Sequence, residues 1–401
     1  MNILIVTPFF TPQTGGVTTH IETLRGSLAE RGHTVLVLRS GESHAIEPCA
    51  ETLDSRVWRL YMRPLWCPEA PLRGFIACLV YLAPTVYRLG RFVQRHGIEL
   101  VSLEYPVAWM GYFLPVRWWT CVKLVAAVHG DDVHSLHLRP RHERWLVRQL
   151  VGRADKVLAH SSRMLADAER DIGELPPVRS HLPYSLDCED LRRQADRVTA
   201  EADGNLPRAR PYVLTIAKLY HRKGLDVMLE ALAGLRHLRG QLQFVIAGDG
   251  PEEAALRTRA AELELEDLVV FAGEIQAGDI PALIRGCEFF VLPSRSEPFG
   301  IALLEAMTFG RAVLATSVGG IPEFVRHEVN GLLVPSENPR ALADGIQRLV
   351  TDLPLRDRLG RTGQQVVERE YDRRALAPKY EAMYASVLET LHSKLEITPA
   401  S

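Results

Sequence analysis

Short apolar runs alternate with longer amphipathic segments from one end of the chain to the other. The short runs of the N-terminal half are apolar on both faces, which predicts strands of a parallel sheet covered by helices on each side. The longer segments between them have the apolar spacing of helices with one buried face. The predicted strands are Asn2–Val6, Thr34–Leu38, Glu99–Leu103, Lys123–Val128 and Lys156–Ala159, and the first predicted helix covers Val17–Arg31.

The same alternation starts again at Tyr212. Two rounds of this pattern predict an α/β protein of two Rossmann-like domains that face an interdomain cleft, a usual place for a ligand. The predicted strands of the second round are Tyr212–Ile216, Gln243–Ala247, Val269–Phe271 and Phe289–Leu292, and its predicted helices are Gly224–Leu238, Glu252–Leu263 and Ile280–Arg285.

One stretch marks the boundary between the two domains. Residues 189–210 are charged and poor in large apolar side chains, so they predict a linker between an N-terminal domain, 1–188, and a C-terminal domain, 211–374. The remaining segment, 375–401, contains an amphipathic stretch, Ala375–Leu391, and a tail. We expect this last helix to fold back onto the N-terminal domain.

Composition narrows the class of protein. The 401 residues are 47% hydrophobic and 24% charged, which fits a globular protein with two cores. A formal net charge of -2 gives no global electrostatic reason to expect a nucleic-acid partner. The six cysteines form no C-x-x-C pair, and the start MNILIVTPFF has no basic region before its apolar run, so we expect a cytoplasmic protein with a buried first strand.

The string SRSEPFGIALLEAMTFG, Ser294–Gly310, follows a predicted strand and turns into a helix. Pro298 suits the first turn of that helix, and Gly300 lets the backbone approach a ligand closely. The backbone amides near Phe299, Gly300 and Ile301 would face a negative group at the positive end of the helix.

Two acids of this string are candidate sugar ligands. Glu297 precedes the helix and Glu305 lies eight residues further on. A carboxylate accepts two hydrogen bonds at once, so each is suited to a pair of adjacent sugar hydroxyls. The alternative for Glu297 is a favourable charge at the helix start, and for Glu305 a solvated helix residue.

A basic loop follows the first strand of the C-terminal domain. Lys218 and Lys223 lie where Val213–Leu232 passes from strand to helix, at a strand end where α/β proteins bind phosphates. Each charge-assisted contact to a diphosphate is worth about 1.5–3 kcal/mol. A solvated basic loop is the alternative.

Glycine-rich turns form a third group of candidates. Gly15 and Gly16 lie between the first strand and the first helix, and Gly248 lies in AGDGPE after a later strand. Gly319 and Gly320 would let backbone amides meet phosphates. Glu323, just beyond them, suits a helix start as well as a ligand site.

His129 ends a predicted strand and begins the string HGDD, a position where α/β proteins place ligand groups. A hydrogen-bonded structural histidine is the alternative. No two aspartates of the chain are separated by a single residue, so a D-x-D metal site is absent. We therefore expect a metal-independent site with no cofactor.

Together these strings resemble the retaining glycosyltransferases of family 4. Their E-x7-E signature matches Glu297 and Glu305, and Pro-Phe-Gly, Leu-Glu-Ala-Met, Gly-x-Gly-Pro, Gly-Gly-x-x-Glu and Asn-Gly-Leu-Leu-Val are also typical of that family. The family's Gly-Arg-Leu is altered, because Ala217 replaces the glycine and Lys218 the arginine. The resemblance covers nearly the whole chain, most strongly from Val213 to Pro335.

The resemblance implies the two-domain architecture called GT-B and retention of anomeric configuration. By it, Glu297 would contact the donor sugar, with help from the amides of Phe299 and Gly300, and Glu305 would hold the ribose. The N-terminal glycine loop would approach the donor phosphate, and His129 would lie beside the reacting face of the sugar. The predicted reaction moves a hexosyl unit from a nucleoside diphosphate sugar to a glycan, lipid-linked or small-molecule acceptor in cell-surface polysaccharide or glycoconjugate synthesis.

Other classes are weighed by the same residues. A nucleotide-sugar epimerase and a non-catalytic nucleotide-sugar-binding protein stay open, whereas no G-x-G-x-x-G supports a dinucleotide-dependent oxidoreductase. A glycan phosphorylase would need pyridoxal phosphate and a longer chain. The segment 60–119 mixes arginine with aromatic residues, which suits either peripheral contact with the inner face of the membrane or an ordinary core with exposed arginines.

Overall fold

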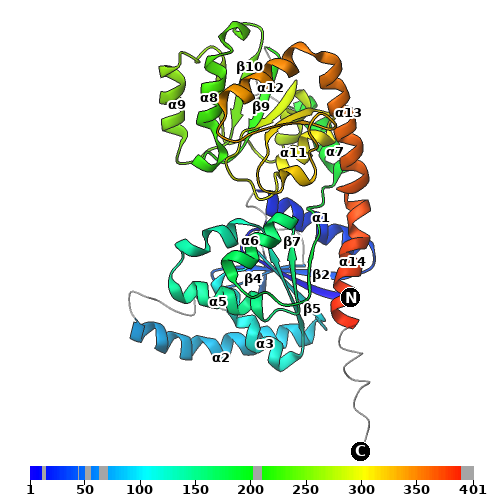
Figure 1. Ribbon diagram of the computed structural model, residues 1–401. Coiled ribbons are helices and arrows are strands. Elements are labelled where there is room, and N and C mark those ends of the chain that lie inside the picture. The colour runs from blue at the N-terminus through cyan, green and yellow to red at the C-terminus, as the bar shows by residue number, and fades with distance from the viewer. Residues whose placement is uncertain (11–14, 44, 50–55, 63–70, 202–209, 390–401) are drawn as a thin grey trace, which may run out of the picture. The chain divides into compact units, whose positions relative to one another are not determined.

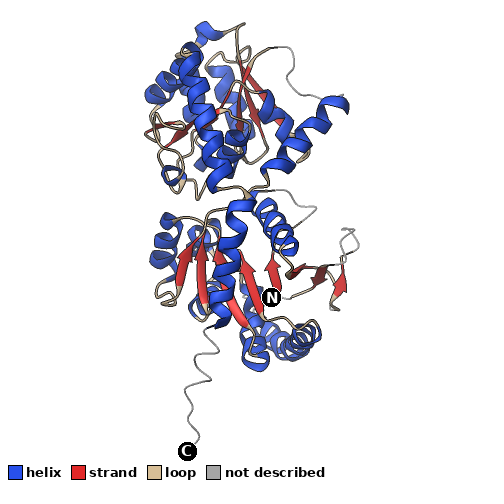
Figure 2. Cartoon of the chain, turned by 90° about the vertical axis from the view of Figure 1, so that its right-hand side faces the viewer, coloured by secondary structure: helices blue, strands red, loops and turns tan. Residues whose placement is uncertain are grey.

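The computed structural model describes the chain apart from residues 11–14, 44, 50–55, 63–70, 202–209 and 390–401 (Figure 1). The chain divides into two compact units, one of Met1–Ser185 with Leu376–Ser401 and one of Leu186–Ala375. Each unit is a sheet of mostly parallel strands with helices around it (Figure 2). The predicted α/β class with two Rossmann-like domains is confirmed.

The first unit contains a sheet of eight strands in the order β3-β4-β2-β1-β5-β6-β7-β8, in which β3 pairs antiparallel to β4 and the other neighbours pair parallel. The strands are β1 Asn2–Thr7, β2 Thr34–Ser40, β3 Glu47–Pro48, β4 Val57–Leu60, β5 Leu100–Glu104, β6 Lys123–Val128, β7 Lys156–Ala159 and β8 Arg179–His181. The α-helices are α1 Gly16–Glu30, α2 Pro71–Arg95, α3 Phe113–Thr120, α4 Asp131–His134, α5 Arg141–Gly152, α6 Ser162–Ile172 and most of α14 Arg373–Glu389.

Alternate residues of these strands face opposite sides of the sheet, as the pleat requires. Ile3 and Ile5 of β1 pack with α1 and with the α14 side chains Leu376 and Tyr380. Leu4 and Val6 pack toward α2 and α3 on the other side, with a cluster that includes Leu89, Phe92 and Phe113. The C-terminal helix therefore covers one face of the first unit's sheet.

The second unit contains a six-stranded parallel sheet in the order β11-β10-β9-β12-β13-β14. The chain starts in the middle, winds outward to one edge and then returns to the centre, so the switch point lies between β9 and β12. The strands are β9 Tyr212–Ile216, β10 Gln243–Ala247, β11 Val269–Gly273, β12 Phe289–Leu292, β13 Ala312–Thr316 and β14 Leu332–Val334. The α-helices are α7 Cys188–Glu201, α8 Leu225–Ala233, α9 Glu253–Glu262, α10 Ile280–Gly286, α11 Ile301–Thr308, α12 Pro339–Thr351 and α13 Leu353–Glu370.

The predicted linker is wrong over most of its length. Residues Cys188–Glu201 form helix α7, which packs against α10 and α11 and belongs to the second unit. Charged residues dominate the stretch because the described charged side chains of this helix are partly or fully exposed, whereas Cys188 and Ala195 are buried. The remainder of the predicted linker is residues 202–209 and Arg210, and residues 202–209 lie outside the described part of the chain.

Candidate functional site

The predicted donor ligands of the second unit gather at the carboxyl ends of β9 and β12. These two strands are neighbours at the switch point of the sheet. Lys218 and Lys223 follow β9, and Glu297 follows β12 in the loop that leads to α11. In open α/β sheets this edge is where ligands bind.

Lys223 and Glu297 meet there in a short ion pair. The Nζ atom of Lys223 donates to Oε2 of Glu297 at 2.5 Å, and the hydroxyl of Ser294 donates to the same oxygen at 3.3 Å. The side chains of the pair are only 13% and 9% exposed. A cation and a carboxylate are thus held side by side at a helix start, where one can meet a phosphate and the other a sugar hydroxyl.

The loops that carry this pair are tied to each other through their backbones. The carbonyl of Arg222 accepts hydrogen bonds from the amides of Arg295 and Ser296 at 2.8 and 3.2 Å. Gly224 has a φ of +64°, and a Cβ there would lie 2.2 Å from the carbonyl oxygen of Pro293. Only glycine fits this position, because a side chain would separate the two loops.

A second clamp joins the same loops through side chains. The guanidinium of Arg295 donates to both carboxylate oxygens of Asp226, at 2.6 and 2.7 Å. This hydrogen bonding outweighs the partial burial of Asp226 and holds the pKa of that carboxyl below its usual value. Such a planar two-point contact fixes direction as well as distance, so the Lys223–Glu297 pair rests on a rigid base.

Lys218 does not join this pair in the described structure. Its Nζ atom donates to Asp249 at 2.5 Å and to Glu274 at 3.1 Å, and these hydrogen bonds raise the pKa of the lysine. All three side chains are about half exposed. Gly248, beside Asp249, donates its amide to the carbonyl of Gly273, so that amide is not available to a phosphate.

The helix expected after Glu297 begins later than the sequence indicated. Helix α11 starts at Ile301 with Gly300 as its N-cap residue, so Pro298 lies outside the first turn. The Phe299 side chain is buried and stacks on Phe324 with ring centroids 5.2 Å apart, so only its backbone can face a ligand. On α11 itself, burial raises the pKa of Glu305 to about 7.

Gly319 packs closely against the backbone of Glu297. Its φ is +56°, and a Cβ at this position would lie 1.7 Å from the carbonyl oxygen of Glu297. The amide of Gly320 donates to that same oxygen at 3.3 Å. The Gly-Gly pair that follows β13 therefore supports the backbone of the candidate sugar-binding acid. That the amides of Gly319 and Gly320 meet phosphates stays a prediction.

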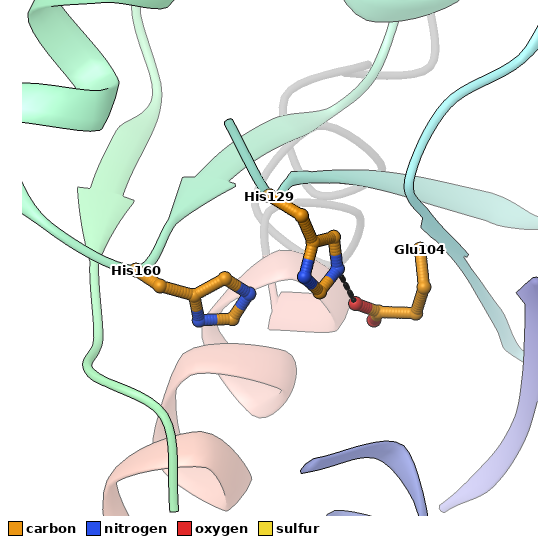
Figure 3. Close-up of side chains that lie close together, drawn as sticks. All are labelled: Glu104, His129 and His160. Carbon is orange, nitrogen blue, oxygen red and sulfur yellow. Dashed lines mark hydrogen bonds and ion pairs between the residues drawn. The ribbon is translucent and has the colours of Figure 1, made fainter. Parts of the chain in front are cut away.

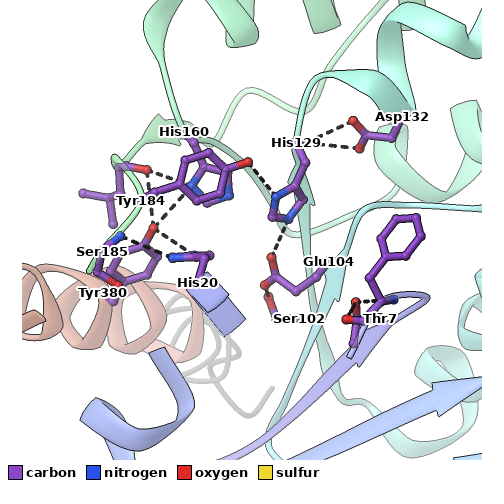
Figure 4. A network of polar contacts seen from close by, with 12 residues as sticks. Thr7, His20, Ser102, Glu104, His129, Asp132, His160, Tyr184, Ser185 and Tyr380 are labelled. Carbon is purple, nitrogen blue, oxygen red and sulfur yellow. Dashed lines mark hydrogen bonds and ion pairs between the residues drawn. The ribbon is translucent and has the colours of Figure 1, made fainter. Parts of the chain in front are cut away.

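In the first unit His129 lies at the end of β6 within a buried polar network (Figure 4). Its Nε2 atom lies 2.9 Å from Glu104 Oε2, and its Nδ1 atom lies 2.8 Å from the hydroxyl of Tyr184. The backbone amide of His129 donates to Asp132, whose pKa burial raises to about 6. The side chain of His129 is fully buried, and both ring nitrogens have protein partners. In this arrangement neither nitrogen is available for the predicted contact with a sugar.

Several members of this network were not singled out from the sequence, among them Glu104, His20 and His160. Glu104 ends β5 and His160 follows β7, so both stand at strand ends on either side of His129. Burial lowers the pKa of His20 to about 3 and that of His160 well below its usual value. The signal that could have found them in the sequence is a polar residue at the end of each consecutive strand.

Gly15 and Gly16, which the sequence also predicted as site residues, lie where α1 begins.

Comparison with known proteins agrees with both halves of this description. Residues 14–183 match the family model described as Glycosyltransferase Family 4, and residues 196–366 match the model described as Glycosyl transferases group 1. The α-D-kanosaminyltransferase of Streptomyces kanamyceticus is 31% identical over 276 residues, which cover 66% of this chain and 71% of that protein. A GDP-mannose-dependent α-(1-6)-phosphatidylinositol monomannoside mannosyltransferase of Mycobacterium tuberculosis is 27% identical over 94% of this chain and 96% of its own.

Solved structures share the fold over nearly the full length. Sucrose-phosphate synthase from Thermosynechococcus elongatus superimposes with a TM-score of 0.75 at 23% identity, over 97% of this chain and 99% of its own. HepE of Anabaena, solved with UDP and glucose, gives a TM-score of 0.73 at 20% identity, over 96% and 100%. The fold and the matched models define a glycosyltransferase of the GT-B type. The chain belongs to family 4 of these enzymes.

Proposed function

We propose that the protein is a retaining hexosyltransferase that uses a nucleoside diphosphate sugar without a metal ion at the diphosphate. The observation that supports this proposal is the Lys223–Glu297 pair at the switch point, 2.5 Å apart and largely shielded from water. HepE, which shares this fold, was solved with UDP and UDP-glucose, and the relative in M. tuberculosis is named as GDP-mannose-dependent. The acceptor is proposed to be a glycan, a lipid-linked sugar or a small molecule.

The charges at this edge suit the reaction. As the glycosidic bond lengthens, negative charge grows on the departing β-phosphate, and an ammonium group already in place stabilises that charge more than it stabilises the bound donor. Lys223 would supply this group. Glu297 would accept hydrogen bonds from hydroxyls of the transferred sugar. Glu305, on α11, would accept hydrogen bonds from the ribose hydroxyls.

The ion pair between Lys223 and Glu297 indicates how the two side chains change partners when the donor binds. In the described structure Lys223 is paired with Glu297, so the donor must draw the lysine toward its diphosphate while the carboxylate turns to the sugar. The negative diphosphate replaces one partner of the lysine, and sugar hydroxyls replace the hydrogen bonds of the acid. The carboxylate loses its cation but keeps hydrogen-bond donors in this exchange, which limits the cost.

A donor screen followed by two variants tests the proposal. UDP-, GDP- and ADP-sugars are first ranked by the rise in melting temperature that each produces, because a ligand of the folded form stabilises it. Lys223→Ala and Glu297→Ala should then lose transfer activity with the best donor. Glu253→Ala on α9, an acid whose ion pair is with its helix neighbour Arg257, is the control that should keep the wild-type rate. A folded Lys223→Ala protein with full transfer rate would rule out the assigned role.

Retention is tested separately. The anomeric proton of the product is followed by NMR from the first minutes of turnover, with the donor of known configuration as reference. A retaining enzyme gives a product of the same configuration as the donor. An inverted product would show that the chemistry differs while leaving the donor site intact.

We further propose that the surface formed by α2 and α3 lies against an anionic membrane. Val80, Tyr87 and Trp118 are 56%, 59% and 88% exposed, and the Tyr87 and Trp119 rings stack at 5.9 Å. Neither helix contains an aspartate or glutamate, and α2 presents exposed arginines at positions 88, 91 and 95. Aromatic rings beside cations are suited to the headgroup zone of a lipid layer. Among the described residues, no helix is long and apolar enough to cross a membrane.

Flotation with vesicles of anionic and of zwitterionic lipid tests this surface. Wild type should float with the anionic vesicles, and Trp118→Ala combined with Arg91→Glu should stay in the soluble fraction. Leu353→Ala removes an exposed apolar side chain, 50% exposed, from the second unit and should float as wild type does. If wild type fails to float, the membrane proposal falls and the donor site is untouched.

A further inference from the structure

Three neighbouring strands of the first unit each end in a potential metal ligand. Glu104 ends β5, His129 follows β6 and His160 follows β7, and these strands are adjacent in the sheet. One ligand atom from each of the three lies within 4.8 Å of the other two. Figure 3 shows the three side chains converging from their strands, and all are buried. The parallel order of the sheet therefore creates a closed cluster of two imidazoles and one carboxylate.

His160 presents an unused lone pair to this cluster. Its Nδ1 atom lies 3.0 Å from the carbonyl oxygen of Leu182, and because a carbonyl only accepts, the proton must be on Nδ1. The Nε2 atom of the neutral ring is then an acceptor. It is buried without a hydrogen-bond partner in the described structure, and its edge of the ring is turned toward His129 (Figure 3). A buried polar atom without a partner is costly, so something is expected to meet it.

The other two side chains are oriented as metal ligands usually are. Glu104 accepts a hydrogen bond from Ser102 at 2.6 Å through Oε1, which leaves Oε2 directed at His129 Nε2, 2.9 Å away. The remaining nitrogen of His129 contacts the hydroxyl of Tyr184. In metal sites the ligating histidine donates its other N–H to an oxygen, and the ligating carboxylate is itself hydrogen-bonded. All three members of the cluster have such an outer partner.

We propose that Glu104, His129 and His160 bind one divalent transition-metal ion of the zinc type. The ion takes the place of the proton between His129 Nε2 and Glu104, and His129 binds as the neutral ring with its proton on Nδ1, from which it donates to the hydroxyl of Tyr184. Zinc binds imidazole and carboxylate at about 2.0–2.2 Å. Ligand atoms at this distance in a tetrahedral site lie about 3.4 Å apart, so the side chains must adjust from separations of up to 4.8 Å, and the fourth position is left for a water. All three ligands belong to the first unit.

The ion would join three strand ends. Because the cluster is closed to solvent, the metal is acquired as the first unit folds and is retained afterwards, as in structural zinc sites. It also fixes the His129 ring in its inward position.

Metal content after folding is the direct test. The full-length protein is produced with and without added ZnCl2, dialysed against metal-free buffer and measured for zinc per chain. Wild type should retain one equivalent, and His160→Asn should retain none, since the amide keeps a donor for Leu182 but lacks the Nε2 position. His237→Asn, which alters an exposed histidine paired with Gln347, should retain one equivalent. Wild type without zinc, or equal zinc in His160→Asn, would overturn the proposal and leave a buried water as the partner of Nε2.

A second variant covers the case in which His160→Asn does not fold. Ser102→Ala removes the hydrogen bond to Glu104 without touching a ligand, and loss of such an outer partner lowers metal affinity by about 10- to 100-fold. Substitution with CoCl2 adds a spectroscopic check. Visible absorption without a sulfur charge-transfer band supports nitrogen and oxygen ligands, whereas a sulfur band would place the ion on a cysteine and refute the assignment.

Discussion

Replacing Gly319 with alanine should disable the donor site through the backbone of Glu297. The new Cβ would lie 1.7 Å from the carbonyl oxygen of Glu297, whereas ordinary contact begins at 3.4 Å, so the two loops must separate by roughly 1.7 Å. The φ of +56° adds about 1–2 kcal/mol for a residue with a side chain. Because Glu297 carries the acid paired with Lys223, the strain falls on the site itself.

The expected effect is larger on the reaction than on the fold. A misplacement of about 1 Å at a reacting site can cost about 100-fold in rate, so kcat/KM for transfer should fall by about two orders of magnitude. The conformational cost should lower the melting temperature by about 2–4 °C for each kcal/mol in a unit of this size. Initial rates at sub-saturating donor and a thermal scan measure the two effects on the same preparation.

Gly278→Ala is the matched control, since a Cβ there meets nothing within 4 Å and its φ is not positive. It should keep the wild-type rate and donor-induced stabilisation. A Gly319→Ala protein with unchanged kcat/KM would refute the reasoning, because it would show that the position of the Glu297 backbone does not govern the reaction. Circular dichroism of both variants separates local displacement from general unfolding.

Three further predictions concern charge. Lys223→Ala should destabilise the second unit by about 3–5 kcal/mol by leaving Glu297 without its cation, and adding Glu297→Gln should restore thermal stability but not transfer rate. The folded pKa of Glu305, about 7, lies above its unfolded value, so its contribution to stability is present below pH 4.5 and is lost as pH rises toward 7. Glu305→Gln should flatten that part of the curve of unfolding free energy against pH, by on the order of 3 kcal/mol, and an unchanged slope would contradict this. The folded pKa of His20, about 3, lies below its unfolded value, so stability should fall as pH drops from 6.5 toward 3, and His20→Asn should weaken this loss in acid denaturation curves.

The candidate site was predicted best where its residues lie close to a strand end in the same segment. Glu297 lies four residues after Pro293, which directly follows the strand Phe289–Leu292, and Lys223 lies in the loop after β9. The local sequence pattern alone was enough to propose both residues. Lys218 had an equally suitable place in sequence. Its partners Asp249 and Glu274 come from the loops after β10 and β11, and nothing within the β9 segment indicates them.

The cluster of Glu104, His129 and His160 also shows that local sequence does not reveal contacts between distant segments. His129 was selected because it ends a strand, and Glu104 and His160 also stand at strand ends. Their proximity depends on the order β5-β6-β7 and on the register that places Glu104 beside Ala127 and Val128 beside Ala159. A contact between residues 25 positions apart follows from this register, and local propensity carries no information about it.

By itself the sequence determined the alternation of strands and helices and the position of the most apolar strands, because the apolar period is a property of each segment alone. It also determined the E-x7-E motif and the family. The tertiary structure decided which strand ends are neighbours, how the Gly319 loop supports Glu297, and that residues Cys188–Glu201 form a packed helix where charge alone indicated a linker. The physical reason is that these outcomes depend on packing between distant segments, whose free energy is gained only when the sheets are assembled.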